Sequence, residues 1–208
     1  MFILCTGRSG SSALIKACKH IDNYTSDHES LSRSFGSERF NYKDNHIEAD
    51  NRLSWHLGQL NKLFGDTAFY VHLKRGRNEV ALSFLNRFYT PESIVDSFCE
   101  GIRMTAPEKL SKEEQLEVCY DYIDTVHSNI EHFLIDKTNV MTISLENICD
   151  DFKLFWYKIG ATGNLEQALK EFEVRHNNSV RRPLNLWYRF KLMVVREWRH
   201  IQMCIKPL

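Results

Sequence analysis

The sequence has no excess of either charge, because Lys plus Arg and Asp plus Glu both number 27 and the formal net charge is zero. Nothing global therefore favours nucleic acid or an anionic lipid surface as a partner, and any anion site must be local. No run approaches the roughly 18 apolar residues of a membrane span. The N-terminus also lacks a basic segment followed by an apolar stretch. We expect a cytoplasmic protein without a membrane span and without a nucleic-acid partner.

The cysteines form no recognisable pairing or metal-binding pattern. There is no CxxC pair and no Cys/His cluster at the spacing of metal ligands. The six residues are Cys5, Cys18, Cys99, Cys119, Cys149 and Cys204. This scatter is typical of reduced thiols in a cytosol, so we expect neither a disulfide framework nor a bound metal.

Internal repeats, low-complexity tracts and obvious linkers are also missing. Hydrophobic residues make up 43% and charged residues 26% of the 208 positions, as in soluble globular proteins. This length suits one domain of ordinary size. We therefore expect a single domain over residues 1–208 with a helical tail at about 183–203.

The hydrophobic pattern alternates between strand-like and helix-like segments. Short apolar runs predict strands at residues 2–6, 68–74 and 139–144, and a further short strand is expected near residues 23–26. Helical spacing predicts helices at residues 11–20, 52–64, 79–88, 112–135, 149–159 and 165–172. The polar remainder of residues 23–51 is expected to be a long loop. This order predicts an α/β fold of three layers, P-loop-like, with a central and mostly parallel sheet flanked by helices.

The first predicted strand breaks directly into the turn "CTGRSGSS". Against the phosphate-binding pattern G-x-x-x-x-G-K-[ST], it supplies Gly10 and Ser12 but has Cys5 for the first glycine and Ser11 for the lysine. Backbone N–H groups and the dipole of the following helix still favour a phosphate-like anion. The candidate residues of this cradle are Gly7, Arg8, Ser9, Gly10, Ser11 and Ser12. The alternative is an ordinary strand-to-helix turn with a solvated arginine.

A second set of anion-binding residues follows the strand predicted at residues 68–74. Arg75 stands at its carboxyl end, and Ser83 comes eight residues later on the next helix. In open α/β sheets, ligands collect at the carboxyl ends of the strands. Arg75 and Ser83 are therefore predicted to bind one phosphate group, separate from the anion at the first turn.

These residues resemble the sulfotransferases that use 3′-phosphoadenosine 5′-phosphosulfate (PAPS), the tyrosylprotein and carbohydrate branches most closely. "GRSGSS" resembles the family's P-R-S-G-[ST]-[ST] loop, and Arg75 with Ser83 resembles its R-D-P-R-x-x-x-x-S element. "ISLENICDDFKLFWYKIGA" is similar to a late family segment in its Glu146, Leu154 and Gly160. One departure is "RGRN", which lacks the proline and places Arg77 one residue early.

The resemblance implies a reaction and a cofactor. A sulfuryl group would pass from PAPS to an acceptor hydroxyl or amine by in-line displacement, without a metal. The acceptor would be a small molecule, a carbohydrate or a peptide. The resemblance places the catalytic base at Glu29, with His28 as its rival. Arg8 would neutralise the anion, and a late loop at residues 175–182 would cover the nucleotide.

Three other interpretations stay open. A P-loop kinase for a small molecule or nucleoside would bind magnesium ATP despite the missing lysine. A P-loop-like domain that binds nucleotide without turnover would keep the cradle and lack the base. In the third interpretation, which concerns the base alone, His28 and Glu29 are two polar residues on a solvated loop.

Overall fold

A computed structural model describes residues 1–90, 93–173, 194 and 198 of the chain. The chain divides into two compact units, the first comprising Met1–Ala81 and Tyr120–Asn178 and the second Leu82–Cys119 and Ser179–Leu208. The single domain expected over residues 1–208 stays a prediction. The helical tail expected at about 183–203 lies outside the described residues, apart from positions 194 and 198.

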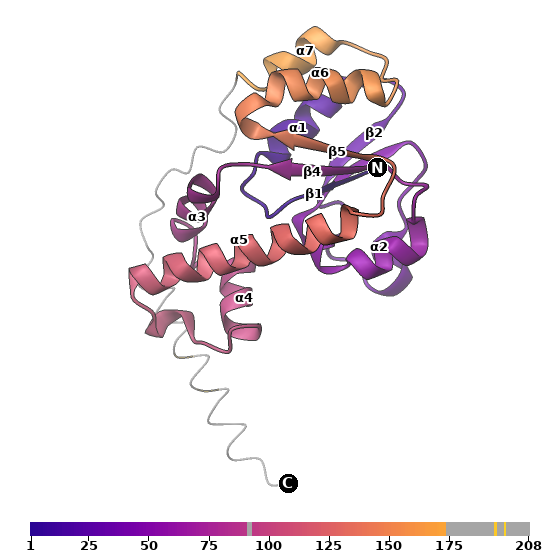
Figure 1. Cartoon of the computed structure of the whole chain (residues 1–208). Helices are drawn as coiled ribbons and strands as arrows, with labels where there is room; N and C mark the ends of the chain where they lie inside the picture. The colour runs from indigo at the N-terminus through magenta and orange to yellow at the C-terminus, as the bar shows by residue number, and fades with distance from the viewer. Residues whose placement is uncertain (91–92, 174–193, 195–197, 199–208) are drawn as a thin grey trace. The chain divides into compact units, whose positions relative to one another are not determined.

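The first unit contains five strands and most of the helices (Figure 1). Its strands are β1 (Phe2–Leu4), β2 (Thr25–His28), β3 (His46–Ala49), β4 (Tyr70–Lys74) and β5 (Val140–Ser144). Its helices are α1 (Ser11–Cys18), α2 (Leu57–Phe64), α6 (Ile148–Lys158) and α7 (Leu165–Lys170), with the 3₁₀ turns η1 (Gly36–Phe40), η2 (Asn51–Trp55) and η4 (Leu145–Asn147). Helices α3 (Arg77–Leu85) and α5 (Lys112–Leu134) continue into the second unit, which holds α4 (Ile94–Gly101) and η3 (Pro107–Lys109).

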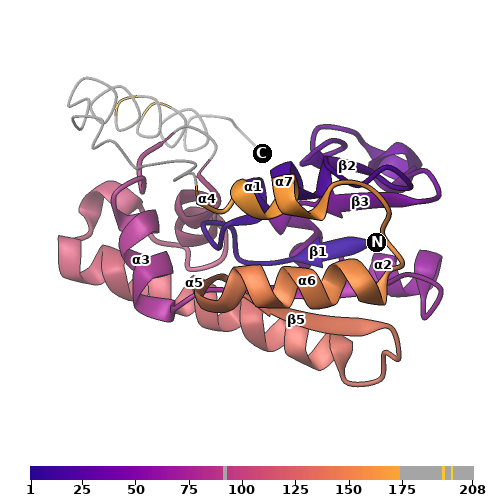
Figure 2. The same ribbon diagram turned by 90° about the horizontal axis from the view of Figure 1, so that it is seen from above.

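The sheet has the strand order β2-β3-β1-β4-β5, and every neighbouring pair is parallel. In Figure 2, β2 and β5 lie toward opposite edges of the sheet. Parallel strands need crossover connections, and helices supply them between β1 and β2, β3 and β4, and β4 and β5. The expected α/β class, with a central parallel sheet between layers of helices, is confirmed.

Each face of the sheet is covered by its own set of helices. Helices α1, α6 and α7 lie together over one face (Figures 1 and 2), where Ile3, Val71 and Phe152 belong to one buried apolar cluster. On the other face, Phe2 packs against Phe64 of α2, with ring centroids 4.8 Å apart. The rings of Tyr70 and Phe133 bring α5 to that same face, at 5.1 Å.

Strand β3 was not predicted, because residues 23–51 were expected to form a loop after the second strand. Its side chains alternate between two different environments. Ile47 and Ala49 join the apolar cluster beneath α1, whereas His46, Glu48 and Asp50 are buried on the opposite side. A strand with one polar face lacks the continuous apolar run by which the other strands were recognised.

The polar side of β3 is covered by the chain that joins β2 to β3. Glu48 is fully buried and accepts hydrogen bonds from the backbone N–H and the hydroxyl of Ser30. Its carboxylate also contacts His46 Nε2 at 3.0 Å. Nearby, the buried Arg39 forms an ion pair with Asp50. These contacts satisfy buried charges that would otherwise be costly, and they hold the connection against the sheet.

Other differences from the sequence-based expectation are local. The helix predicted at residues 52–64 is interrupted at His56, which separates η2 from α2. Asp50 caps η2 by accepting a hydrogen bond from Arg52 N at 2.8 Å. Helix α4 was not predicted.

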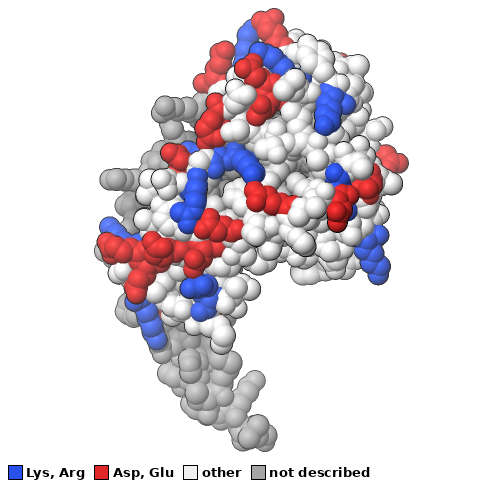
Figure 3. All heavy atoms as spheres, in the orientation of Figure 1, with Lys and Arg blue, Asp and Glu red and all other residues white. Residues whose placement is uncertain are grey.

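The described surface mixes both charge signs. Figure 3 shows Lys and Arg side chains interspersed with Asp and Glu on the face it presents. Among the described residues, no helix is long and apolar enough to cross a membrane.

Two histidines on the α5 side of the sheet form a hydrogen-bonded pair. His72 Nε2 of β4 lies 2.8 Å from His127 Nδ1 of α5, and His72 is only 2% exposed. Burial, with the nearby His127 and Lys74, lowers the pKa of His72 from 6.5 to about 3. Burial also lowers the pKa of His127. Both rings are therefore neutral in the folded protein near neutral pH.

This histidine pair predicts that the free energy of unfolding decreases at acidic pH. Between about pH 6.5 and pH 3, the unfolded chain binds a proton at His72 that the folded protein excludes. The free energy of unfolding should therefore fall as the pH falls through this window, by about 1.4 kcal/mol per pH unit for this one group. His72→Leu should make the acid limb of the stability curve shallower, as measured by urea unfolding from pH 7 to pH 4. Equal slopes for His72→Leu and the unaltered protein would contradict the assignment.

Candidate functional site

The candidate site lies at the carboxyl edge of the sheet, where the turns after four parallel strands meet. The loop of residues 5–10 follows β1, Glu29 follows β2, Asp50 follows β3 and Arg75 follows β4. Strand β1 lies between β3 and β4 in the sheet. After β1 the chain first forms the strands on the β3 side, and it later crosses back to form those on the β4 side. Open α/β sheets bind ligands at such a switch point.

The loop after β1 adopts the left-handed conformation at three of four successive residues. The φ angles are 80° at Gly7, 59° at Arg8 and 96° at Gly10. Helix α1 then begins at Ser11 without a side-chain cap. Within the described part of the chain, the backbone N–H groups of Ser11 and Ser12 donate no hydrogen bond. This uncapped helix start can therefore bind an anion.

Three hydrogen bonds from distant parts of the chain fix the backbone of this loop. Tyr122 Oη donates to Thr6 O at 2.7 Å, and Ser54 Oγ donates to Cys5 O at 3.1 Å. Arg75 Nη1 donates to Arg8 O at 3.0 Å. The last contact joins the two anion-binding segments that the sequence predicts, since Arg75 reaches directly to the loop after β1.

Ser9 differs from the other residues of the predicted cradle. It is fully buried, and its Oγ has no nitrogen or oxygen partner among the described residues. The neighbouring thiol is that of Cys5, whose pKa is raised by burial. The whole of Ser9 is therefore closed to a ligand in this structure, whereas the Ser11 and Ser12 hydroxyls lie beside His28.

The two candidate bases have different partners. His28 Nε2 lies 2.9 Å from Ser11 Oγ and 3.5 Å from Ser12 Oγ, so its imidazole faces the uncapped start of α1. Glu29 forms an ion pair with Arg52, whose Nη1 is 3.0 Å from Glu29 Oε2. His28 therefore lies beside the uncapped start of α1, and Glu29 lies beside a cation.

Glu29 is held firmly by its backbone. Its φ angle is 55°, which is unfavourable for a residue with a Cβ. Its N–H donates to Ala49 O at 3.0 Å, and the next residue, Ser30, is bonded to the buried Glu48. Strained conformations of this kind persist where the surrounding structure fixes them, and they concentrate at functional sites.

The two arginines after β4 also have separate contacts. Arg77 donates two hydrogen bonds to Asp124, at 2.8 Å and 2.6 Å, and its guanidinium lies over the ring of Tyr120. Arg75 instead points back to the loop after β1. Of the two, only Arg75 has a described contact with the predicted cradle.

Glu146 supports the turn after β4. It accepts hydrogen bonds from Gly76 N at 2.7 Å and from Ser144 Oγ. Burial acts to raise the pKa of Glu146, but these hydrogen bonds outweigh it and hold the pKa below its usual value. The carboxylate is therefore ionised and orders the turn that carries Arg75.

Two predicted elements are not placed with this group. Ser83 lies on α3 but belongs to the second unit, so its pairing with Arg75 stays a prediction. The late loop predicted at residues 175–182 lies outside the described residues.

No protein-family model matches the chain, and no curated protein sequence is significantly similar to it. The residues and their geometry are therefore the grounds for any functional assignment. Within residues 1–90 and 93–173, no group of three or more His, Cys, Asp or Glu side chains could hold a metal ion.

Sequence reasoning did not identify several residues that shape this edge. Arg52 pairs with Glu29, Tyr122 holds Thr6, and Leu145 packs against Gly10. These contacts join residues far apart in the chain, and no local motif signals them.

Gly10 generates a prediction about the loop. A Cβ added there would lie 2.6 Å from Leu145 Cδ1, at a φ of 96°. Gly10→Ala should therefore destabilise the protein by about 3 kcal/mol, from backbone strain and overpacking together. Urea unfolding measures the loss.

Gly36 is the matched control. It also has a positive φ, of 58°, but no atom within 4 Å of an added Cβ. Gly36→Ala should cost only about 1 kcal/mol, and Leu145→Ala should restore part of the stability that Gly10→Ala loses. Equal losses for the two glycine variants would show that Leu145 does not pack as described.

Proposed function

We propose that this protein is a sulfotransferase that uses PAPS. The observation that carries the proposal is the hydrogen bond from Arg75 Nη1 to Arg8 O, which joins the two predicted anion-binding segments at one edge of the sheet. A nucleotide with phosphate groups at both its 5′ and 3′ positions needs two such anion sites. Neither the fold class nor the loop alone would favour this cofactor over other nucleotides.

The loop after β1 would bind the 5′-phosphosulfate. The free N–H groups of Ser11 and Ser12 and the start of α1 suit its negative charge. Arg8 would add a planar cation, and Arg75 with Ser83 would bind the 3′-phosphate. A lysine-free loop suits this donor, because no β/γ-phosphate has to be bound.

The reaction would break the bond from sulfur to the bridging phosphate oxygen and form a bond from sulfur to the acceptor oxygen or nitrogen. Glu29 would take the acceptor's proton on Oε1, because Oε2 contacts Arg52. His28, beside Ser11 and Ser12, would contact the transferred group. The leaving phosphate would remain on the loop, which stabilises the charge that develops there.

The acceptor would be a small molecule, a carbohydrate or a peptide, and the reaction would take place in the cytoplasm without a metal ion. Two other functions compete with this proposal. A kinase would require magnesium ATP, and a binding-only domain would take the same nucleotide without turnover.

Ligand selectivity tests the cofactor. In thermal-shift titrations, 3′-phosphoadenosine 5′-phosphate should stabilise the protein at much lower concentration than adenosine 5′-phosphate or magnesium ATP. Arg75→Ala should weaken binding of the doubly phosphorylated ligand at least tenfold and that of adenosine 5′-phosphate far less. Arg77→Ala, which removes an arginine already engaged by Asp124, is the matched control. A preference for magnesium ATP would favour the kinase, and equal losses for both ligands would remove Arg75 from the 3′-phosphate site.

Turnover tests the base. Glu29→Gln should retain the affinity for 3′-phosphoadenosine 5′-phosphate but lower sulfuryl transfer by a factor of about 100 to 10,000. Transfer is measured with radiolabelled PAPS against a panel of hydroxyl and amine acceptors. His28→Asn should weaken transfer without abolishing it, because the asparagine amide keeps a polar contact to the transferred group. If Glu29→Gln is fully active and His28→Asn is inactive, the base is His28; binding without product from any acceptor would favour the binding-only domain.

A further inference from the structure

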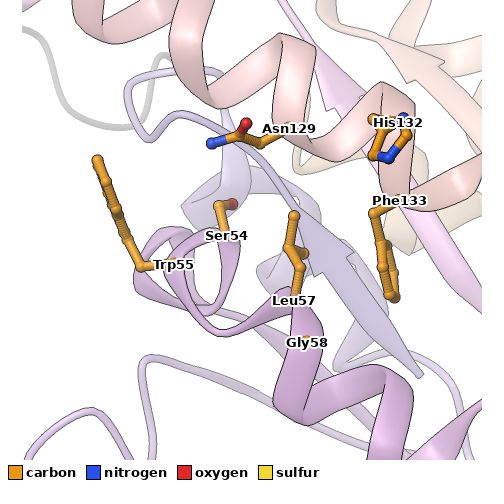
Figure 4. Close-up of a pocket in the computed structure, with 7 residues that line it drawn as sticks. All are labelled: Ser54, Trp55, Leu57, Gly58, Asn129, His132 and Phe133. Carbon is orange, nitrogen blue, oxygen red and sulfur yellow. The ribbon is translucent and has the colours of Figure 1, made fainter.

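An open pocket of about 370 Å³, called the cavity below, lies in the first unit. One of its lining residues, Ser54, donates a hydrogen bond to Cys5 O in the loop after β1. It is bounded on one side by η2 and the start of α2, and on the other by α5 (Figure 4). Its volume falls at the lower end of the range found for small-molecule sites. None of its lining residues was assigned to the nucleotide or to the proposed base.

Aromatic and aliphatic side chains form the walls of this cavity. Figure 4 shows Trp55 at one end and Phe133 at the other, with Leu57 between them. The Trp55 ring stacks on Tyr122 at 6.4 Å between centroids, and the Phe133 ring meets the edge of Tyr70 at 5.1 Å. Both rings are therefore held in place before any ligand arrives, although Trp55 is still 38% exposed.

Two polar side chains of α5 line the same cavity. Asn129 and His132 are three residues apart and so project from one face of the helix. Neither side chain makes a hydrogen bond or ion pair within the described residues, so the amide and the imidazole are available to a ligand. The lining contains no Lys, Arg, Asp or Glu, and it therefore offers no fixed charge for an ionic ligand to pair with.

We infer that this cavity binds an uncharged, planar aromatic molecule that carries a hydrogen-bonding group such as a hydroxyl. The ring would lie against Trp55 and Phe133, where aromatic contacts add to simple burial. Its polar group would be bonded by Asn129 or His132. The inference does not depend on the proposed sulfuryl transfer, since it requires neither the loop after β1 nor a nucleotide.

Calorimetric titration of the full chain with 2-naphthol tests the inference. One saturable site is expected, with binding that is at least tenfold weaker for the saturated analogue decahydro-2-naphthol and for the anionic naphthalene-2-carboxylate. Trp55→Ala should weaken 2-naphthol binding about tenfold. Tyr157→Ala removes a more exposed aromatic side chain from α6, outside the cavity, and should change nothing.

A second variant keeps the test valid if Trp55→Ala disturbs Tyr122. Asn129→Asp changes an exposed position of α5 and places a charge in the cavity, so it should preserve the unfolding temperature and weaken 2-naphthol binding about tenfold. The inference is wrong if 2-naphthol shows no saturable binding, or if both cavity variants bind it as the unaltered protein does. It is also wrong if 3′-phosphoadenosine 5′-phosphate displaces 2-naphthol, because the ring would then occupy the nucleotide site.

Discussion

The arrangement of this protein depends on one short strand with a parallel partner on each side. Strand β1 pairs with β3 and β4, and its three residues are all buried. Because these strands run in the same direction, the segments that follow them must emerge at one edge. The turn of residues 5–10, the Glu29 backbone and the Arg75 side chain are neighbours for this reason, although long stretches of sequence separate them.

Strand β3 gives the edge its rigidity. Its apolar side chains complete the core beneath α1, and its polar ones anchor the connection from β2. Turn η2 follows β3 directly and carries both Arg52, which contacts Glu29, and Trp55, which bounds the cavity. Arg52 and Trp55 are three residues apart, so they lie on the same side of this 3₁₀ turn. The proposed catalytic edge and the cavity are therefore built from the same short segment.

Sequence analysis predicted those elements that have a recognisable local pattern of their own. The apolar runs that became β1, β4 and β5 were recognised, and so was the glycine-rich turn before α1. Strand β3 was overlooked because its alternate residues are His46, Glu48 and Asp50, and their burial depends on Arg39 and Ser30 from elsewhere. The contact between Arg75 and Arg8 O was likewise invisible, since neither residue's neighbours reveal which backbone oxygen the guanidinium meets. Local sequence patterns therefore predict where strands and helices form, whereas the contacts between distant residues depend on the topology of the fold.

Strand β2, at the edge of the sheet beside β3, also affects how readily the protein aggregates at high concentration. Strand β2 has only four residues, Thr-Ser-Asp-His, and three of them are exposed. An open strand edge is a template on which other molecules can add their own strands. A short edge with an aspartate in it is a poor template, so this side of the sheet resists edge-to-edge aggregation.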